Sequence, residues 1–248
     1  MPTHLRHFFL PMLDHIKTSK ILFLDIETVP QVYHFDDLDE EKQELWDDKT
    51  KFKRKEDQSA EDIYDTAGIL AEFGKIVCIS VGFIQQNKLR LKSFYGDDEK
   101  ELLTNFNQLL KNHYSSNNDL LCAHNGKEFD FPYIARRMLI NGLSLPSLLD
   151  IAGKKPWEIN HLDTMELWKF GDYKHYTSLS LLTNIFNIPS PKDDISGEDV
   201  ARVYWEDNDV ERIAKYCEKD VVATAQLFRR YKGQPLLKEE HIISVMDD

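Results

Sequence analysis

The sequence predicts one α/β domain built on a mixed five-stranded sheet flanked by helices. Short β-rich apolar runs alternate with longer segments in which apolar residues recur every three or four positions, the spacing of a helix face. The chain has 248 residues and is 42% hydrophobic, which is enough for a sizeable core. We therefore expect a domain over residues 20–232, with an N-terminal helical extension at 1–19 and a C-terminal tail at 233–248.

The first strands follow the extension. Residues 1–19 have helix-like apolar spacing that Pro11 interrupts. Residues 20–28, KILFLDIET, are typical of a short buried strand, and Pro30 ends it because the residue before a proline disfavours helix. Two β-rich runs around the turn QQNK, within residues 74–96, predict a hairpin of two strands. Between the first strand and this hairpin, at about residues 35–65, dense mixed charge and sparse apolar residues favour an exposed helical insertion.

Helices and two further strands account for the rest of the domain. Asp97 or Asp98 can cap a helix that runs to about Tyr114. The fourth strand is DLLCAHN, and HLDTMELWKF could be a fifth strand or its edge. The remaining predicted helices are FPYIARRMLING, SLSLLTNIFNI and the long segment from residue 196 to residue 231.

Asp25 and Glu27 end the first strand and are the first candidates for a functional site. Residues two apart in a strand point to the same side, so the two carboxylates project together. The D-x-E spacing alone is a weak signal, because residues 39–41 and 97–99 repeat it in a charge run and at a helix start. Only Asp25 and Glu27 follow an apolar strand, where solvation does not explain them.

Three more candidates each have a structural alternative. Asp130 could simply cap a helix that begins at Pro132. Tyr216 and Asp220 are four residues apart on a predicted helix and share a face. A half-buried tyrosine and a solvated aspartate would look the same in the sequence, and Tyr33 and Asp37 repeat this spacing.

Taken together and in this order, the three motifs resemble those of the DEDD exonucleases, in the subgroup that carries a tyrosine. The likeness is closest to the proofreading exonuclease domain of family B DNA polymerases, whose motifs read D-I-E-T, N-x-x-x-F-D-x-P-Y-[IL] and Y-C-x-K-D. This chain has DIET, NGKEFDFPYI and YCEKD. The resemblance spans roughly residues 20–230 and implies an RNase H-like fold.

The resemblance also implies roles for the candidate residues. Asp25, Glu27, Asp130 and Asp220 would bind two divalent metal ions, Mg²⁺ or Mn²⁺, and Tyr216 would orient the attacking water. Four clustered carboxylates repel one another by on the order of 4 kcal/mol per pair at about 4 Å and an effective dielectric near 20, and cations relieve this repulsion. Oxygen ligands favour Mg²⁺ or Mn²⁺ over zinc. Asn125 and the backbone near Thr28 would hold the 3′-terminal nucleotide.

We therefore expect a stand-alone, metal-dependent 3′-5′ exonuclease that releases nucleoside 5′-monophosphates from single-stranded DNA. Its partner would be a nucleic acid 3′ end, and the sequence does not indicate which proteins it binds. The alternatives are a 3′-5′ exoribonuclease, a nucleic-acid-binding module that has lost catalysis, and an RNase H-like endonuclease, which the Y-x-x-x-D helix disfavours. The net charge of -12 argues against broad electrostatic gripping of nucleic acid and predicts short contacts with a few unpaired nucleotides.

Other features exclude competing classes. No run approaches the roughly 18 apolar residues of a membrane span, and FFLPML is too short for a signal peptide, so we expect a cytoplasmic protein. Cys78, Cys122 and Cys217 lack C-x-x-C spacing and are expected to be reduced core residues. YGDD at residues 95–98 predicts a turn and a helix cap. His124 is expected to be a structural neighbour of the site.

Overall fold

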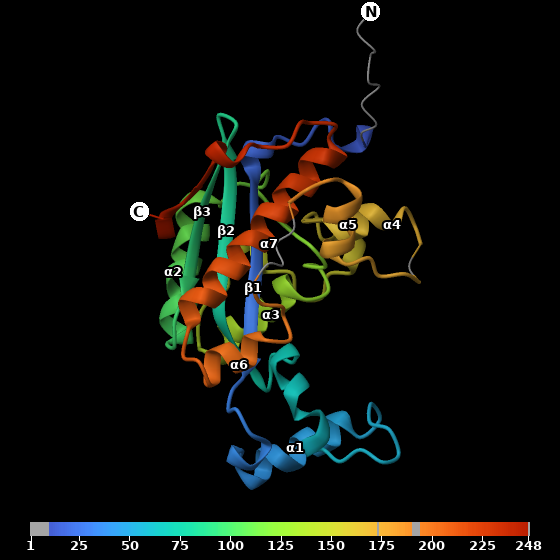
Figure 1. Ribbon diagram of the computed structural model, residues 1–248, viewed down its shortest axis with the longest axis vertical. Helices are drawn as coiled ribbons and strands as arrows, with labels where there is room; N and C mark the ends of the chain where they lie inside the picture. The colour runs from blue at the N-terminus through green and yellow to red at the C-terminus, as the bar shows by residue number, and fades with distance from the viewer. Residues whose placement is uncertain (1–9, 173, 190–193, 248) are drawn as a thin grey trace, which may run out of the picture.

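A mixed sheet of six strands forms the centre of the molecule. The computed structural model describes residues 10–172, 174–189 and 194–247. The sheet order is β5-β4-β1-β2-β3-β6 (Figure 1). β2 is antiparallel to β1 and β3, and the other neighbouring pairs are parallel. The strands are β1 (Ile21–Pro30), β2 (Gly74–Gln85), β3 (Lys88–Tyr95), β4 (Leu120–Ala123), β5 (Leu162–Asp163) and β6 (Ile242–Ser244).

The predicted α/β class, a mixed sheet flanked by helices, is confirmed, but the predicted number of five strands is wrong. The sixth strand, β6, lies in the segment expected to be a tail and pairs with β3 through only three residues. A strand this short carries no readable alternation, so pairing with β3, not local sequence, defines it. The predicted hairpin is confirmed: Gln86 and Asn87 both have positive φ, as a tight two-residue turn requires.

Helices cover both faces of the sheet, and the alternation along β1 decides which side chains meet which helix. Leu22, Leu24 and Ile26 join the core that packs against α2 (Glu99–His113) and α3 (Asp130–Ile140). The odd-numbered residues of β1 pack on the opposite side, against α6 (Val200–Trp205) and α7 (Val210–Tyr231). Asp25 and Glu27 therefore project toward α7. Two short helices, α4 (Thr164–Lys169) and α5 (Leu179–Ile185), lie beside the C-terminal half of α7.

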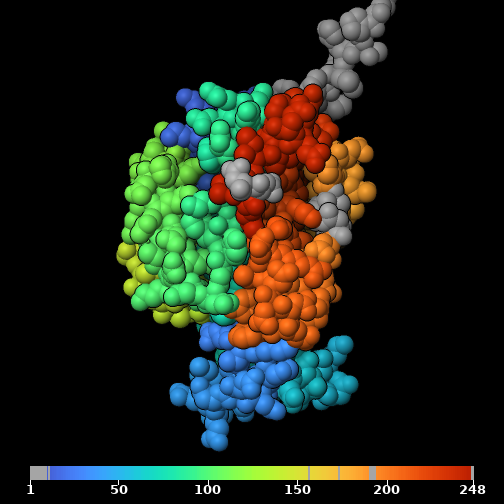
Figure 2. Space-filling view, turned by 60° about the vertical axis from the view of Figure 1, so that its left-hand side comes forward, coloured from blue at the N-terminus to red at the C-terminus, as the bar shows by residue number. Residues whose placement is uncertain are grey.

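The charged segment between β1 and β2 forms a separate projection, which we call the lobe (residues 31–73). It contains η3 (Phe35–Asp37), α1 (Glu40–Thr50) and η4 (Glu61–Ile69), and it protrudes from one end of the molecule (Figures 1 and 2). Leu45, Phe52 and Ile69 of the lobe are exposed. Its other large apolar residues are buried or partly buried, and a small core of its own contains Leu38, Trp46, Tyr64, Ala67 and Phe73. The lobe is thus a folded unit with its own packing.

The N-terminal extension contains two short 3₁₀ turns in its described part, Pro11–Leu13 and Thr18–Lys20, and residues 1–9 lie outside the described residues. Asp98 caps α2 through a hydrogen bond from the Glu101 N–H, which confirms the turn-and-cap interpretation of YGDD. Within the described ranges, no helix has the length and apolar character needed to cross a membrane.

A buried ion pair ties the helices on one face to β2 and to the base of the lobe. Arg137 of α3 binds both oxygens of Glu99 of α2, and it also donates to the carbonyl of Ala71 at 2.8 Å. Glu99 accepts a further hydrogen bond from the backbone N–H of Ile76 at 2.7 Å. Both charged side chains are almost fully buried.

Arg137→Met is expected to lower the free energy of unfolding by about 3–5 kcal/mol, because it leaves the Glu99 carboxylate buried without its charge partner. Urea unfolding followed by circular dichroism measures the loss. The control is Arg136→Met, which makes the same change at the exposed neighbouring position. Equal losses in the two variants would show that the buried pair contributes nothing specific.

Candidate active site

The acidic pair of β1 lies at an irregularity of the sheet. Glu27 pairs with Cys78 of β2, but the next residue, Thr28, pairs with Ile76, so one residue of β2 is left over as a β-bulge. Bulges change the local twist and the aim of side chains, and they occur preferentially beside active sites. Glu27 is buried and Asp25 is half-buried, and both face α7.

Helix α7 brings the third motif against this pair. The Cys217 thiol donates to the backbone carbonyl of Asp25 at 3.3 Å and lies 3.4 Å from its Oδ2. One carboxylate oxygen of Asp25, one of Glu27 and the Cys217 sulfur all lie within 4.8 Å of one another. Tyr216, one residue earlier, is buried and its hydroxyl hydrogen-bonds the Asp220 carboxylate. Two positions that are almost 200 residues apart in the chain are therefore in direct contact.

Asp130 approaches the same cluster from the start of α3. The capping alternative is wrong, because α3 begins at Asp130 itself and the residue before it, Phe129, occupies the cap position. Asp130 is only 3% exposed, and its Oδ1 has no hydrogen-bond partner in the part of the chain that the structure describes. A buried polar atom left unpaired is costly and is usually explained by a function or by a bound ion.

Asp25, Glu27 and Asp130 all have raised pKa values. Burial raises the pKa of Asp25 well above its usual value, and the charges of Asp220, Glu27 and Asp130 raise it further. Burial likewise raises the pKa of Glu27, with contributions from Asp220 and Asp130. Burial is also the main cause that raises the pKa of Asp130 to about 8. The structure thus brings Asp25, Glu27, Asp130, Asp220 and Tyr216 together.

These pKa shifts make stability depend on pH when no cation is bound. The folded pKa of Asp130 lies above its unfolded value near 3.9, so between about pH 4 and 8 the folded state keeps a proton that the unfolded chain has lost. Stability therefore falls as the pH rises through this window. In EDTA, we expect Asp130→Asn to reduce this decline by about 1.4 kcal/mol per pH unit between pH 5 and 7.

Thermal unfolding in EDTA at a series of pH values measures the slope. Adding MgCl₂ should restore stability most strongly at pH 8, because a ligand that binds only the folded state stabilises it. Asp57→Asn, which changes an exposed aspartate of the lobe, should leave the slope unchanged. An Asp130→Asn protein with the wild-type slope would contradict the assignment of this pH dependence to Asp130.

Asp163 supports this site and was missed by sequence reasoning. Its buried carboxylate accepts hydrogen bonds from the backbone N–H groups of Asn125 at 3.0 Å and Lys127 at 3.1 Å. It also caps α4, through the N–H groups of Met165 and Glu166. Asp163 therefore fixes the loop that leads to Asp130. Asp163 followed by Thr164 is a sequence signal for a helix start. This signal does not predict the hydrogen bonds that Asp163 accepts from the loop at Asn125 and Lys127.

The two predicted substrate residues lie beside the acidic cluster. Asn125 has a positive φ of 65°, and its buried Oδ1 has no partner among the described residues. Thr28 lies with Glu27 at the edge of a cleft of about 1000 Å³ that separates the end of β1 from the lobe. His124 uses both ring nitrogens within the fold, one to the Thr164 hydroxyl at 2.9 Å and one to the Thr177 carbonyl at 3.0 Å.

The donor set suits a hard divalent cation. Asp25, Glu27, Asp130 and Asp220 offer carboxylate oxygens, and the unpaired Oδ1 of Asp130 is available to a ligand. Burial raises the pKa of Cys217 well above its usual value, so the thiol stays protonated and is a poor metal ligand. All three cysteines are free and buried, as predicted.

This chain is similar to a family of predicted exonucleases and to DNA polymerases. A family model described as a predicted 3′-5′ exonuclease related to the exonuclease domain of PolB matches residues 69–241, a range that contains Asp130, Tyr216 and Asp220 and follows β1. A DNA polymerase of Pyrococcus glycovorans is 24% identical over 161 residues, 56% of this chain and 20% of that protein. A DNA polymerase of Desulfurococcus sp. (strain Tok) is 21% identical over 182 residues, 64% of this chain and 23% of that protein.

The chain spans only about a fifth of the length of these curated relatives. Among solved structures, the family B DNA polymerase from Pyrobaculum calidifontis aligns with 86% of this chain and 27% of its own, with 15% identity and a TM-score of 0.47.

Proposed function

The chain belongs to the family of predicted 3′-5′ exonucleases related to the exonuclease domain of PolB, and from this membership and its acidic cluster we propose a metal-dependent 3′-5′ exonuclease. Its substrate is the 3′ end of single-stranded DNA, and its products are nucleoside 5′-monophosphates. The observation that carries the proposal is the meeting of four carboxyl groups from β1, α3 and α7. The pKa values of three of them, Asp25, Glu27 and Asp130, are raised.

Asp25, Glu27, Asp130 and Asp220 would hold two divalent cations, Mg²⁺ or Mn²⁺. When bound, such cations lower the pKa of water and stabilise the charge of the phosphoryl transition state. A carboxylate oxygen of Asp25 lies within 4.8 Å of one of Glu27 and of the Cys217 sulfur, so Asp25 and Glu27 would both hold the ions. The Cys217 thiol restrains the Asp25 side chain by hydrogen bonding.

Tyr216 positions the attacking water. Burial raises the pKa of its hydroxyl far above the usual value, and Asp220, Glu27 and Asp25 raise it further, so the phenol remains neutral at working pH. A neutral hydroxyl can donate or accept a hydrogen bond but cannot serve as the base. Asn125 and the backbone around Thr28 hold the terminal nucleotide, with the unpaired Oδ1 of Asn125 available as an acceptor.

The test uses a DNA strand labelled at its 5′ end, incubated with the protein and Mg²⁺, Mn²⁺ or EDTA. We expect a ladder that shortens one nucleotide at a time from the 3′ end, released mononucleotides that carry a 5′-phosphate, and no reaction in EDTA. A matched RNA strand tests the exoribonuclease alternative. Internal cleavage products would indicate an endonuclease, and tight binding without turnover would indicate a binding module; either result would overturn the proposal.

A further inference from the structure

We propose that the lobe is the outer wall of the substrate cleft, and that its carboxylates restrict this cleft to a few unpaired nucleotides of a single strand. The inference rests on the proposed function and adds to it the segment and the residues that restrict the substrate to a single strand. Residues 31–68 of the lobe precede the range matched by the family model, which begins at residue 69.

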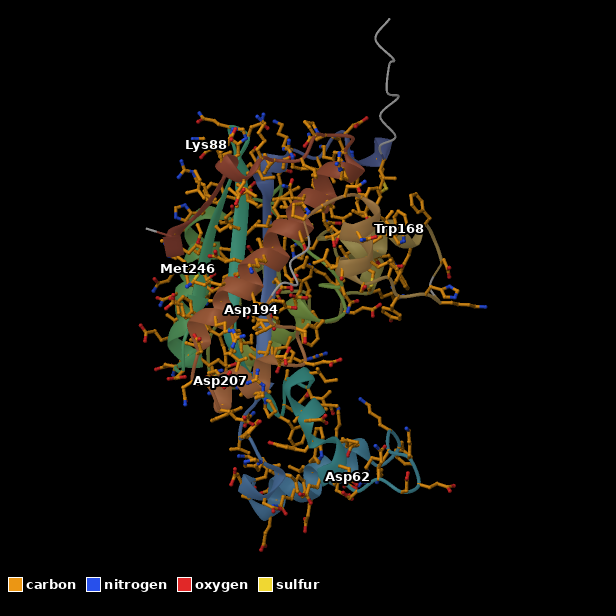
Figure 3. All side chains as sticks on the ribbon, in the orientation of Figure 1. Asp62, Lys88, Trp168, Asp194, Asp207 and Met246 are labelled. Atoms are coloured by element: carbon orange, nitrogen blue, oxygen red, sulfur yellow. The ribbon has the colours of Figure 1, made fainter. Side chains whose placement is uncertain are left out.

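The cleft connects the lobe directly to the acidic cluster. Glu27, Thr28 and Phe129 line its inner end, η3 and η4 of the lobe line one side, and residues 197–202 at the start of α6 line the other. Its volume of about 1000 Å³ is at the upper limit of ordinary small-ligand sites, which leaves room for a few nucleotides at most. In Figure 3, Asp62 marks the lobe and Asp207 marks the α6–α7 connection above it.

Several contacts hold the lobe in place against the sheet. The Tyr133 hydroxyl of α3 donates to the carbonyl of Gly68 at 2.7 Å. A Cβ atom at Gly68 would lie 3.2 Å from the backbone of Val29, so glycine permits this close approach. The Tyr33 hydroxyl binds Glu206 and its ring stacks on Trp205, which joins the lobe to the opposite side of the cleft. The wall is therefore a fixed part of the fold.

The charge of the walls is strongly unfavourable for a phosphate backbone. Asp36, Glu61 and Asp65 line the lobe side, and Glu198 lies on the α6 side. All four side chains are exposed, and none of them has an ion pair within the described ranges. The guanidinium of the cleft residue Arg202 is bound to Asp207 at 2.8 Å. A strand with many phosphates is repelled here, since nucleic-acid affinity normally comes from neutralising phosphates with cations.

Aromatic rings offer the complementary contact. Phe35 of the lobe and Phe129 of the body line the cleft, together with His34 and Tyr33. Bases stack on such rings without regard to sequence. A short unpaired end can thus enter with its bases against the rings and its scissile phosphate at the acidic cluster, whereas a duplex would add a second phosphate backbone against the carboxylates. The walls therefore select against double-stranded ends.

The experiment neutralises the wall without touching the acidic cluster. The triple variant Asp36→Asn, Glu61→Gln, Asp65→Asn is compared with the control triple Glu41→Gln, Glu44→Gln, Glu56→Gln, which removes the same charge from exposed lobe positions outside the cleft. Initial rates on a single strand and on a blunt duplex are measured in Mg²⁺ at 30 mM and 300 mM salt. Binding of both DNAs is measured in parallel by fluorescence anisotropy.

We expect the wall triple to lower KM for the single strand by about three- to tenfold at low salt and to raise the relative rate on the duplex, with both effects shrinking at high salt. The control triple should change KM less than about twofold. Equal values in the two triples would overturn the inference while leaving the exonuclease in place. A wild type that hydrolyses nothing would overturn the proposed function. In that case, tighter DNA binding by the wall triple, but not by the control triple, would still support the lobe as the charged wall of the cleft.

Discussion

Asp25→Asn is expected to lower the rate of 3′-end hydrolysis by at least about 10³-fold. The substitution keeps the shape of the side chain but removes one of the four negative charges that attract the cations, and each cation contributes several kcal/mol of charge stabilisation to the transition state. Asp25 is also in contact with the Cys217 thiol and raises the pKa of Tyr216, so it is central to the cluster. Single-turnover rates on a labelled strand with saturating Mg²⁺ measure the loss.

A measurement of thermal stability separates the loss of hydrolysis in Asp25→Asn from misfolding. Since burial and neighbouring carboxylates raise the pKa of Asp25, the folded protein without cations already favours a neutral side chain at this position. Asp25→Asn should therefore unfold at the same or a higher temperature than wild type in EDTA, and it should lose the stabilisation by MgCl₂. The control is Asp39→Asn, which alters another D-x-E sequence, at the cap of α1, and should leave the rate unchanged. An active Asp25→Asn protein would rule out the proposed site.

Local patterns sufficed for the parts of the site that depend on local geometry. The alternation of β1 places Asp25 and Glu27 on one face, and the helical period places Tyr216 and Asp220 on one face, so each pair was predictable from spacing alone. That these pairs meet could not follow from spacing, because the contact between Cys217 and Asp25 bridges 192 positions of sequence. Only the resemblance of the motifs pointed to it.

The features that were missed depend on contacts between distant segments. Asp163 looks like an ordinary helix cap, and its second role toward Asn125 and Lys127 arises only when β5 lies beside β4. The lobe's core is built from apolar residues spread over about 35 positions without a regular period, so no pattern predicted it. Strand β6 is likewise defined by its partner β3.

Tyr216→Phe is expected to reduce the rate of hydrolysis by about 10²-fold while leaving cation binding and the fold intact. The ring packs with Val203, Ile213 and other apolar residues, and phenylalanine keeps this packing. What is lost is one hydroxyl that hydrogen-bonds Asp220 beside the cations, and removing one such positioned group from an active site typically costs about 10²–10³-fold in rate. Rates at saturating DNA and Mg²⁺ measure the loss, and MgCl₂-induced thermal stabilisation measures cation binding.

The pH profile distinguishes a positioning tyrosine from a tyrosine that acts as the base. The pKa of Tyr216 is raised far beyond the working range, so the hydroxyl does not ionise below pH 10, and its removal should lower the profile without changing its shape. A base would instead produce a rate that rises with pH in the wild type and is flat in Tyr216→Phe. The control, Tyr204→Phe, removes a hydroxyl that donates to Asp97 in the turn before α2 and should affect stability but not rate. A flattened profile in Tyr216→Phe would therefore assign the proton transfer to the phenol itself, against the positioning role that its burial among carboxylates supports.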